Sequence, residues 1–332
     1  MLGKMDVSGV SDRGRVRDRN EDQFLIADLA RQACVRGTSM SYDSGQPVAH
    51  ATQGRLVAVA DGSGRRAGGD RASQLVVETA AEQIIRRMPP GAAAASSVGL
   101  QRHLRQTAHA CQARIEREVG VFPDYHGMGS TLTLGYLSWP DLYLLHVGNS
   151  RCYLLRDSQL RLLTTDHNAV QSAAASGSGE LRAEPTASAR HRLWNLLGGD
   201  TPELHAEVST TKLQLGDCLL FCSDGLSDAV DERSMTVILD RHPASADACS
   251  ALVAEANRNG GSDNITAVVV RFWPKSATPA QAAAAEAVTD SGQTAGSDGP
   301  WHAAASPAAG AREVEADTVD FDGPRPAVVA AR

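Results

Sequence analysis

The sequence predicts an α+β fold in which antiparallel strands and long helices form separate layers. Four apolar segments follow one another with short links between them, namely "STLTLGYL", "DLYLLHVG", "SRCYLLR" and "QLRLLTT". Links as short as "SWP", "GN" and "DS" cannot hold a parallel crossover, so these segments are expected to form an antiparallel meander. Long helical segments are interspersed with the strands, which argues against a doubly wound parallel sheet.

Three helices and three further strands are predicted from apolar spacing and from the residues that end each segment. Residues 69–88 place apolar side chains at helical intervals and stop at Pro89 and Pro90. Two more helices are expected over 96–119 and 245–259. Buried strands are expected over the apolar segments 54–60, 217–223 and 264–273.

Composition and charge limit the class of protein. The 332 residues are 42% hydrophobic and carry a net charge of −7 with acids and bases mixed. We therefore expect one large domain with an appendage, and no nucleic-acid partner.

No run of about 18 apolar residues is present, and the N-terminal segment is charged where a signal peptide would be apolar. These features predict a cytoplasmic protein without a membrane contact. None of the six cysteines forms a C-x-x-C pair, so free thiols are expected.

The composition changes after Lys275. Residues 276–332 are rich in Ala, Gly, Pro, Asp and Ser, and their eight acidic and three basic residues give a net charge of −5. Large apolar residues are scarce there, so the segment is expected to be a mostly disordered tail behind a domain of residues 1–275. Trp301 and "VEADTVDFDGP" leave open the alternative of a short docking segment.

Acidic residues recur at the ends of the apolar segments. Asp61 follows "LVAVA", Asp224 follows "LLFCS", and Asp263 precedes the last predicted strand. Glu21 and Asp22 stand just before the segment expected to be the first strand. If these carboxylates converge they repel one another, and a hard divalent cation such as Mg²⁺ or Mn²⁺ relieves the repulsion.

Glycine and arginine fit the same hypothesis. Gly62 permits a tight turn after Asp61, so that Asp61 bridges two ions while the Gly62 carbonyl adds a ligand. Arg17, which precedes Asp22 in "GRVRDRNED", is placed to hold a phosphate through paired hydrogen bonds. The alternatives are ordinary turn chemistry for each Asp-Gly pair and a solvated charge for Arg17, which stands among Arg13, Arg15 and Arg19.

Eight motifs occur in an order that is typical of one enzyme family. They are "SDRGRVRDRNED", "VAVADGSG", "AGGDRAS", "GMGSTLT", "HVGNSRCYLLR", "TTDHN", "LLFCSDGLSD" and "GGSDNITAVVV". Over residues 6–272 the chain resembles the metal-dependent type 2C serine/threonine protein phosphatases, most of all the compact bacterial form. The resemblance implies an α-β-β-α sandwich, two antiparallel sheets flanked by helices on both sides, with a two-metal centre at one edge.

The resemblance also implies a role for each site residue. It implies direct metal ligation by Asp61, Asp224 and Asp263 and by the Gly62 carbonyl. Glu21 and Asp22 would support metal-bound waters, with Asp228 near the centre, and Arg17 would grip the substrate phosphate. Phosphorus would be attacked by a hydroxide held between two Mn²⁺ or Mg²⁺ ions, so no nucleophilic side chain is required.

Two positions depart from the family pattern. Ser63 stands where relatives have Met or His, and a serine is a poor general acid, so leaving-group protonation from water is expected. Asn149 stands in "GNSR" where relatives place an Asp that helps to bind a third, weaker metal. A neutral amide is a poor ligand for a hard dication, so we expect two bound ions, retained activity and a degenerate third site.

One further segment and three histidines complete the set of expectations. Residues 174–199 occupy the place of the family's flap, with a helix expected over 189–197, and are predicted to be a mobile lid. Three histidines match no metal-ligand spacing and are expected to be structural, namely His126, His146 and His191.

The leading hypothesis is a monomeric enzyme that hydrolyses phosphoserine and phosphothreonine on proteins, opposing a bacterial Hanks-type kinase or regulating type VI secretion. One alternative is a weakly active phosphoprotein-binding regulator with a phosphatase fold. Another is a phosphatase for an anti-sigma antagonist, a role that usually brings an additional sensor domain.

Overall fold

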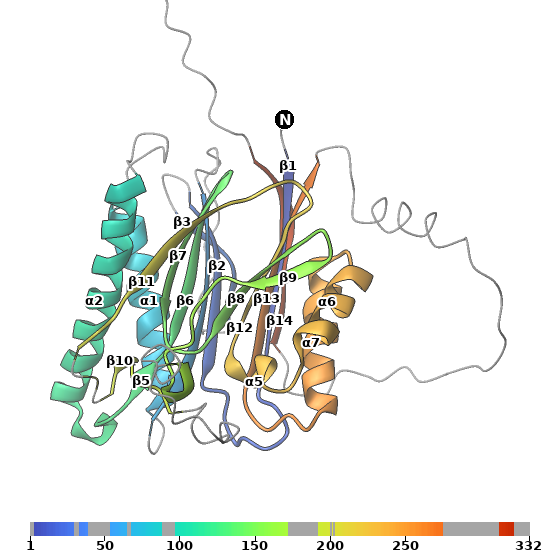
Figure 1. The fold of residues 1–332 in the computed structure, drawn as a ribbon. Helices are drawn as coiled ribbons and strands as arrows, with labels where there is room; N and C mark the ends of the chain where they lie inside the picture. The colour runs from blue at the N-terminus through green and yellow to red at the C-terminus, as the bar shows by residue number, and fades with distance from the viewer. Residues whose placement is uncertain are drawn as a thin grey trace, which may run out of the picture.

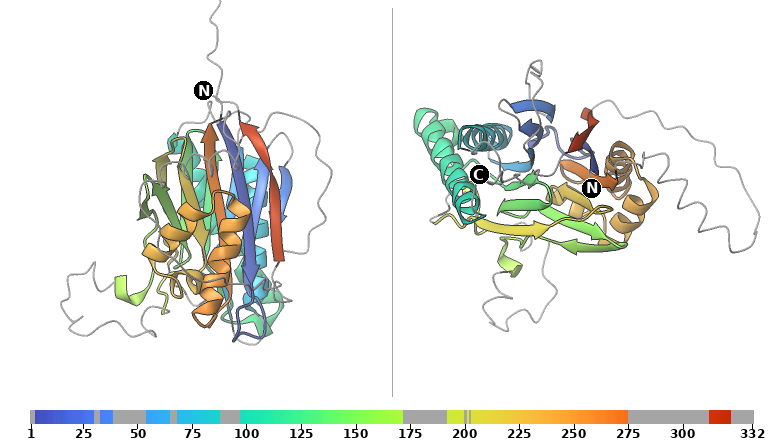
Figure 2. Two further views of the ribbon diagram at one scale, coloured as in Figure 1. Left: turned by 90° about the vertical axis from the view of Figure 1, so that its right-hand side faces the viewer. Right: turned by 90° about the horizontal axis from the view of Figure 1, so that it is seen from above.

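The computed structural model describes residues 3–29, 33–38, 54–64, 68–87, 97–171, 192–199, 201, 203–274 and 312–321. Two antiparallel sheets lie face to face in the middle of the molecule, and helices cover the outer side of each (Figure 1). Figure 2 shows the same layers from the side and from above. This is the α-β-β-α sandwich that the resemblance implies, and the predicted fold class is confirmed.

The first sheet, sheet I, has the strand order β14-β1-β13-β12-β8-β9. Its strands are β1 (Gly3–Asp12), β8 (Arg151–Arg156), β9 (Gln159–Leu162), β12 (Cys218–Cys222), β13 (Ile265–Pro274) and β14 (Arg312–Phe321). The helices on its outer side are α5 (Asp224–Ser227), α6 (Glu232–Arg241) and α7 (Ser245–Arg258).

The second sheet, sheet II, has the order β10-β5-β4-β6-β7-β11, and β2 pairs with both β4 and β3. Its strands are β2 (Asp22–Leu29), β3 (Ala33–Thr38), β4 (Gly54–Ser63), β5 (Gly129–Ser130), β6 (Leu132–Ser138), β7 (Asp141–Val147), β10 (Leu197–Gly198) and β11 (Glu207–Lys212). Its outer face is covered by α1 (Gly69–Arg87) and α2 (Ser97–Val121), which leads into the short 3-10 helix η2 (Pro123–Tyr125).

Strand β4 shows why the predicted strands are apolar on both faces. Leu56 and Ala58 belong to the core between sheet II and its helices, whereas Val57 and Val59 belong to the core between the two sheets. A third core lies between sheet I and helices α6 and α7. A strand with one face in each of two cores reads as a continuous apolar run, because both sets of alternating side chains are buried. Among the described helices, none is both long and apolar enough to cross a membrane.

The expected meander is wrong at its centre. β6 pairs with β7 and β8 pairs with β9, but β7 lies in sheet II and β8 lies in sheet I. The link between them is therefore a crossing from one sheet to the other, at Gly148–Ser150, with Gly148 at φ +107°. Glycine adopts this positive φ without steric cost, and the turn at Gly148 directs the chain from sheet II into sheet I. The crossing places Asn149 at the edge where both sheets end.

Two further expectations require correction. The first strand is β1, which precedes the segment at Asp22 that was expected to be first. Within the described part of the lid segment, residues 192–199 form an isolated bridge at Leu193 and strand β10, and not the expected helix. Pairing with β5 takes up the backbone groups that a helix would have used. The remainder of the lid, with His191, lies outside the described residues.

Part of the tail forms a strand. Arg312–Phe321 form β14, which pairs antiparallel with β1 at the edge of sheet I; this strand lies largely within "VEADTVDFDGP", for which the alternative of a docking segment was left open. The sequence "REVEADTVDF" alternates polar and apolar residues over most of its length, a pattern that an edge strand accepts. Residues 275–311 and 322–332 lie outside the described residues, so the domain boundary at 275 stays a proposal.

Candidate active site

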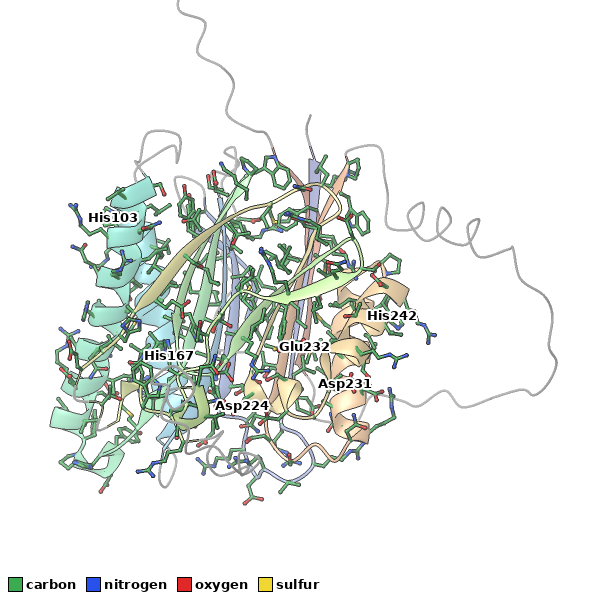
Figure 3. All side chains as sticks on the ribbon, viewed as in Figure 1. His103, His167, Asp224, Asp231, Glu232 and His242 are labelled. Carbon is green, nitrogen blue, oxygen red and sulfur yellow. The ribbon has the colours of Figure 1, made fainter. Side chains whose placement is uncertain are left out.

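Strand ends from both sheets meet at one edge of the sandwich. β4 of sheet II carries Asp61, while the start of α5 and the approach to β13 in sheet I carry Asp224 and Asp263. Figure 3 labels Asp224 at this edge. A cavity of about 410 Å³ opens there, and its lining includes seven of the predicted site residues, namely Arg17, Glu21, Asp61, Gly62, Asn149, Asp224 and Asp263.

Asp61 is held by its backbone, which leaves its carboxylate free to face the cavity. Its N–H donates to Thr131 Oγ1 at 2.9 Å, and its carbonyl accepts from the Thr131 N–H at 2.9 Å. The Thr131 hydroxyl is itself hydrogen bonded to Ser150 Oγ at 2.7 Å. Thr131 is a functional residue that the sequence analysis missed, although the motif "GMGSTLT" contained it.

The buried, negatively charged surroundings of the Asp61 carboxyl favour the binding of a cation. Desolvation raises the pKa of its carboxyl well above the usual range, and the negative charges of Asp224, Asp22 and Asp263 raise it further. We call these four residues the carboxylate cluster. A carboxylate buried among like charges is unfavourable unless it is protonated or bound to a metal ion.

Asp22 is the most deeply buried member of the carboxylate cluster, with 1% of its surface exposed. Its Oδ2 accepts hydrogen bonds from Ser223 Oγ and Thr266 Oγ1, both at 2.7 Å, whereas its Oδ1 is buried and has no partner within the described part of the chain. Burial raises the pKa of Asp22 to about 7 in spite of the two hydroxyl donors. The unpaired Oδ1 is therefore an acceptor ready for an additional donor, such as an ordered water.

The glycines that follow Asp61 and Asp224 are required because other parts of the backbone approach them closely. A Cβ on Gly62 would lie 2.0 Å from the Gly69 carbonyl oxygen, and a Cβ on Gly225 would lie 2.0 Å from that of Asn264. These contacts bring the start of α1 and the loop before β13 against the cluster. The Gly62 N–H also donates to the Glu21 carbonyl at 3.2 Å, which ties the β4 end to the segment that carries Glu21.

Asn264 organises the loop before β2 and was also missed. Its Oδ1 accepts from the Glu21 N–H at 2.9 Å, and its Nδ2 donates to the carbonyls of Arg13 and Arg19 at 2.9 and 2.8 Å. One side chain thereby fixes both ends of the arginine-rich loop. The signal in the sequence was "SDN", in which only the acid had been given a role.

Arg17 projects from that loop to the mouth of the cavity. Its Nη2 donates to Asp263 Oδ2 at 2.7 Å, and just over half of its side chain is exposed. The hydrogen bond to Asp263 raises the pKa of Arg17 above its usual value. The guanidinium therefore stays charged at the mouth of the cavity.

Asn149 and Asp228 lie beside the cluster rather than in it. Asn149 is 6% exposed, and its Nδ2 donates to Asp224 Oδ2 at 2.9 Å. Its Oδ1 is buried and has no hydrogen-bond partner within the described residues. The Asp228 N–H donates to the Asp224 carbonyl at 2.8 Å, and the Asp228 side chain lines a neighbouring cavity of about 250 Å³.

A second group of metal-ligating side chains, the histidine cluster, consists of His146, His167 and Glu207, whose ligand atoms lie within 4.8 Å of one another. Figure 3 labels His167. Its Nδ1 accepts from the Gly148 N–H at 3.1 Å and from Asn195 Nδ2 at 2.8 Å. The proton therefore sits on Nε2, which faces Glu207 Oε2 at 3.6 Å, and that nitrogen has no lone pair for a metal.

His146 is likewise fully engaged. Its Nδ1 bonds to Thr133 Oγ1 at 2.9 Å, and its Nε2 donates to the Thr165 carbonyl at 3.0 Å. Burial lowers its pKa to about 4, so the ring is neutral at ordinary pH. These contacts agree with the structural role expected for His146, and His126 lies exposed after η2.

The carboxylate cluster fits a pair of hard divalent cations and the histidine cluster does not. The first offers several carboxylate oxygens, mutual repulsion and an unpaired buried acceptor. Those are the features that Mg²⁺ or Mn²⁺ relieves on binding. In the second, every ring nitrogen is already paired or protonated.

Comparison with known proteins agrees with this geometry. Residues 33–259 match the family described as protein phosphatase 2C. The serine/threonine protein phosphatase PstP of Mycobacterium tuberculosis is 33% identical over 259 residues, which cover 78% of this chain and 43% of PstP. The chain thus spans under half the length of that relative. The serine/threonine phosphatase stp of Listeria monocytogenes is 28% identical over 260 residues, which cover 78% of this chain and 93% of stp.

Solved structures give the same result. The catalytic domain of PstP in complex with two manganese ions is 32% identical, covers 82% of this chain and 100% of that domain, and superposes with a TM-score of 0.62. PppA, described as a key regulatory component of T6SS in Pseudomonas aeruginosa, is 27% identical, covers 81% of this chain and 98% of its own, and has a TM-score of 0.60. The matched residues contain two members of the carboxylate cluster, Asp61 and Asp224, while Asp22 and Asp263 lie outside the matched range. By its sequence match and its fold, the chain belongs to the protein phosphatase 2C family.

Proposed function

We propose that this protein hydrolyses phosphoserine and phosphothreonine on proteins with the help of two divalent cations, Mn²⁺ or Mg²⁺. The observation that carries the proposal is the convergence of carboxylates from both sheets on one cavity, with the pKa of Asp61 raised by burial and then by the charges of the others. A similar two-manganese complex is known for the PstP catalytic domain. The family membership and the electrostatics therefore support the same chemistry.

The ions would be held by a small set of groups. Asp61, Asp224, Asp263 and the Gly62 carbonyl line the cavity together and would hold the ions, with Asp61 as the ligand expected to be shared. When bound, the two ions supply an activated water and positive charge for the phosphoryl oxygens. Glu21 and Asp22 orient the surrounding waters, for which Asp22 Oδ1 is the available acceptor. Asp228 acts from the neighbouring cavity.

Arg17 binds the substrate phosphate. Its guanidinium is paired with Asp263 Oδ2, so binding of an anionic phosphate, together with a cation at Asp263, moves the guanidinium from carboxylate to phosphate. The exposed side chain has the freedom to make that change. Paired N–H donors then hold two phosphoryl oxygens in a fixed orientation.

The leaving group takes its proton from water. Ser63 is exposed at the cavity mouth, and a serine hydroxyl is too weak an acid to protonate a departing alkoxide at neutral pH. The described lining of the cavity contains no histidine. Water is the remaining proton source, as the sequence analysis expected.

The biological setting is a further proposal. We assign the catalytic unit to residues 1–275 and expect a cytoplasmic monomer that acts on phosphorylated proteins, among them a Hanks-type kinase or its substrates. The likeness to PppA keeps regulation of type VI secretion as a possible setting. For an anti-sigma pathway, no observation within the described residues adds support.

A weakly active phosphoprotein-binding regulator remains the second candidate, because one observation favours it. Asn149 gives Asp224 an amide partner where relatives carry an acid, which reduces the negative charge beside the cluster. The intact Asp61, Asp224 and Asp263 support the enzyme instead, since a pure binding module has no need of them.

One assay separates the two candidates. Hydrolysis of a phosphothreonine peptide is measured with Mn²⁺ and with EDTA, for the wild type and for Asp61→Asn. The enzyme predicts Mn²⁺-dependent turnover that Asp61→Asn and EDTA both abolish. Peptide binding by the wild type without turnover at any Mn²⁺ concentration would support the binding module and reject the enzyme.

A further inference from the structure

The second cavity, of about 250 Å³, adjoins the catalytic cavity and shares Asn149 and Asp224 with it. Its other charged lining comes from Arg151 at the start of β8, from Asp166 after β9, and from Asp228 at the end of α5. The two cavities are thus neighbouring compartments at one edge of the sandwich. A bound substrate that reaches the first can extend into the second.

The lining of the second cavity has an excess of acidic groups. Asp166, Asp224 and Asp228 face one basic residue, Arg151, which gives a formal charge of −2; with Asp224 assigned to an ion, Asp166, Asp228 and Arg151 still leave a charge of −1. Arg151 is committed to Asp166, because its Nε and Nη2 donate to the two carboxylate oxygens at 2.9 and 2.7 Å. That pairing holds the pKa of Arg151 well above its usual value and leaves the guanidinium little capacity to attract an anion.

An unpaired acceptor provides an independent indication of a ligand. Asn149 is 94% buried, and its Oδ1 has no hydrogen-bond partner within the described part of the chain. Its amide nitrogen is already used by Asp224, so only the carbonyl is available. A buried acceptor beside carboxylates is satisfied by a group that only donates, as the ammonium of lysine and the guanidinium of arginine do.

We propose that this cavity binds a lysine or arginine side chain of the phosphoprotein substrate, at a position close to the phosphorylated residue. The inference rests on the proposed function, since the phosphate must occupy the catalytic cavity. The two cavities would then bind groups of opposite charge. The first binds the phosphate beside Arg17 and the cations, and the second binds a basic side chain among aspartates. The size of the second cavity suits one extended side chain rather than a larger ligand.

Synthetic phosphothreonine peptides test this preference directly. One peptide has only small neutral residues around the phosphothreonine, and in the others a single lysine or a single glutamate is moved through each flanking position. With Mn²⁺ present, kcat/KM should be about three- to ten-fold higher for lysine at the one or two positions that reach the cavity. Glutamate at the same positions should lower kcat/KM below that of the neutral peptide.

Gln171 allows the cavity charge to be changed without touching the catalytic groups. It is exposed and lines the cavity, and its backbone N–H donates to Asn168 Oδ1 at 3.0 Å, a hydrogen bond that a new side chain leaves intact. Gln171→Lys should remove most of the lysine preference, and Gln171→Glu should increase it about two- to three-fold. Gln101→Lys on α2 is the charge control: it loses the hydrogen bond from Gln101 Nε2 to Thr210 Oγ1, but it should leave the lysine preference unchanged, since its neighbour His103 lies well apart from Asp224 in Figure 3.

The outcomes separate this inference from the proposed function. Equal kcat/KM for lysine, neutral and glutamate peptides would overturn the inference and leave the phosphatase intact. A lysine preference that Gln171→Lys and Gln101→Lys reduce equally would also overturn it, because the effect would then come from overall charge. A preference that disappears as Mn²⁺ is raised above the level that saturates turnover would assign the cavity to a metal ion instead. Failure to hydrolyse any of the peptides would reject both proposals.

Discussion

The carboxylate cluster and the histidine cluster contain similar numbers of metal-ligating groups, but their hydrogen bonding is opposite. In the histidine cluster, His146 and His167 use their ring nitrogens on hydroxyl, carbonyl, amide and carboxylate partners. In the carboxylate cluster, Asp61 is crowded by three other aspartates and Asp22 keeps an unpaired buried oxygen. The difference teaches that a metal centre is recognised by charge left uncompensated, not by ligand types alone.

The largest expected effect follows from removing the central carboxylate. Asp61→Ala should lower Mn²⁺-dependent hydrolysis of a phosphothreonine peptide by about a thousandfold or more, because both ions lose a ligand. Glu207→Gln, the matched change in the histidine cluster, should keep turnover within about three-fold. Steady-state kinetics and circular dichroism of both variants provide the measurement. Near-normal activity of Asp61→Ala would show that the comparison assigns the metal to the wrong cluster.

The next effect concerns pH and lies in the histidine cluster. Burial, and then the neighbouring His167, lower the pKa of His146 from 6.5 to about 4. The folded protein therefore binds fewer protons than the unfolded chain between these values, so stability falls as pH decreases from about 6.5 to about 4. The loss from His146 amounts to at most about 3 kcal/mol.

Urea unfolding at several pH values measures this loss. His146→Gln should be less stable at neutral pH but should show a shallower decline toward pH 4. His109→Gln, at an exposed position of α2, should follow the wild-type curve. If the His146→Gln and wild-type curves run parallel, the ring titrates normally in the fold and the description of a fully engaged cluster is wrong.

A third effect separates function from stability. In EDTA above neutral pH, Asp61→Asn should raise the free energy of unfolding by about 1–2 kcal/mol, because it removes a desolvated charge that Asp224, Asp22 and Asp263 repel. The same change should remove most of the increase in melting temperature that Mn²⁺ gives the wild type. Glu207→Gln should instead lower stability in EDTA, since a neutral amide oxygen is a weaker acceptor for the His167 N–H than a carboxylate. The same sign for both variants would contradict the distinction between the clusters.

Much of the fold and the site could be predicted because the information is local. The strand ends at Asp61 and Asp224 are marked by an apolar run, an acid and a glycine within a few residues. Strands buried on both faces, such as β12, are marked by their continuous apolar run. The family resemblance then supplied the sandwich and the roles, which neither composition nor spacing could supply.

What could not be predicted depends on distant partners. The bond from Asn149 to Asp224 joins residues 75 positions apart, and the bonds of Asp22 to Ser223 and Thr266 span still longer separations. β1 was missed because its inward positions are interrupted by Ser8 and Ser11, which are buried in the fold but read as polar in the sequence. The crossing at Gly148 was read as a hairpin, since a short link alone does not say which sheet receives the next strand.

The smallest expected effect concerns Asn149 and tests whether this residue takes part in metal binding. Its amide donates to Asp224 Oδ2 at 2.9 Å, so the side chain supplies a hydrogen bond where an acid would supply a further charge. In Asn149→Asp the ionised side chain cannot donate, and two carboxylates face each other at the same separation. Without metal, the variant should lose about 1 kcal/mol of stability relative to the wild type.

Mn²⁺ should reverse that loss, because the added carboxylate supplies both charge and an oxygen ligand for a third, weakly bound ion. Equilibrium dialysis at millimolar Mn²⁺ should then find more bound ions in Asn149→Asp than in the wild type, which is expected to hold two. Asn149→Ala separates the two causes: it removes the hydrogen bond without adding a charge, so it should lose stability in EDTA but gain no ion. Equal ion counts in all three proteins would show that a carboxylate at position 149 adds no metal site. A third tightly bound ion in the wild type would show that Asn149 is itself part of the metal centre. Either result would contradict the prediction.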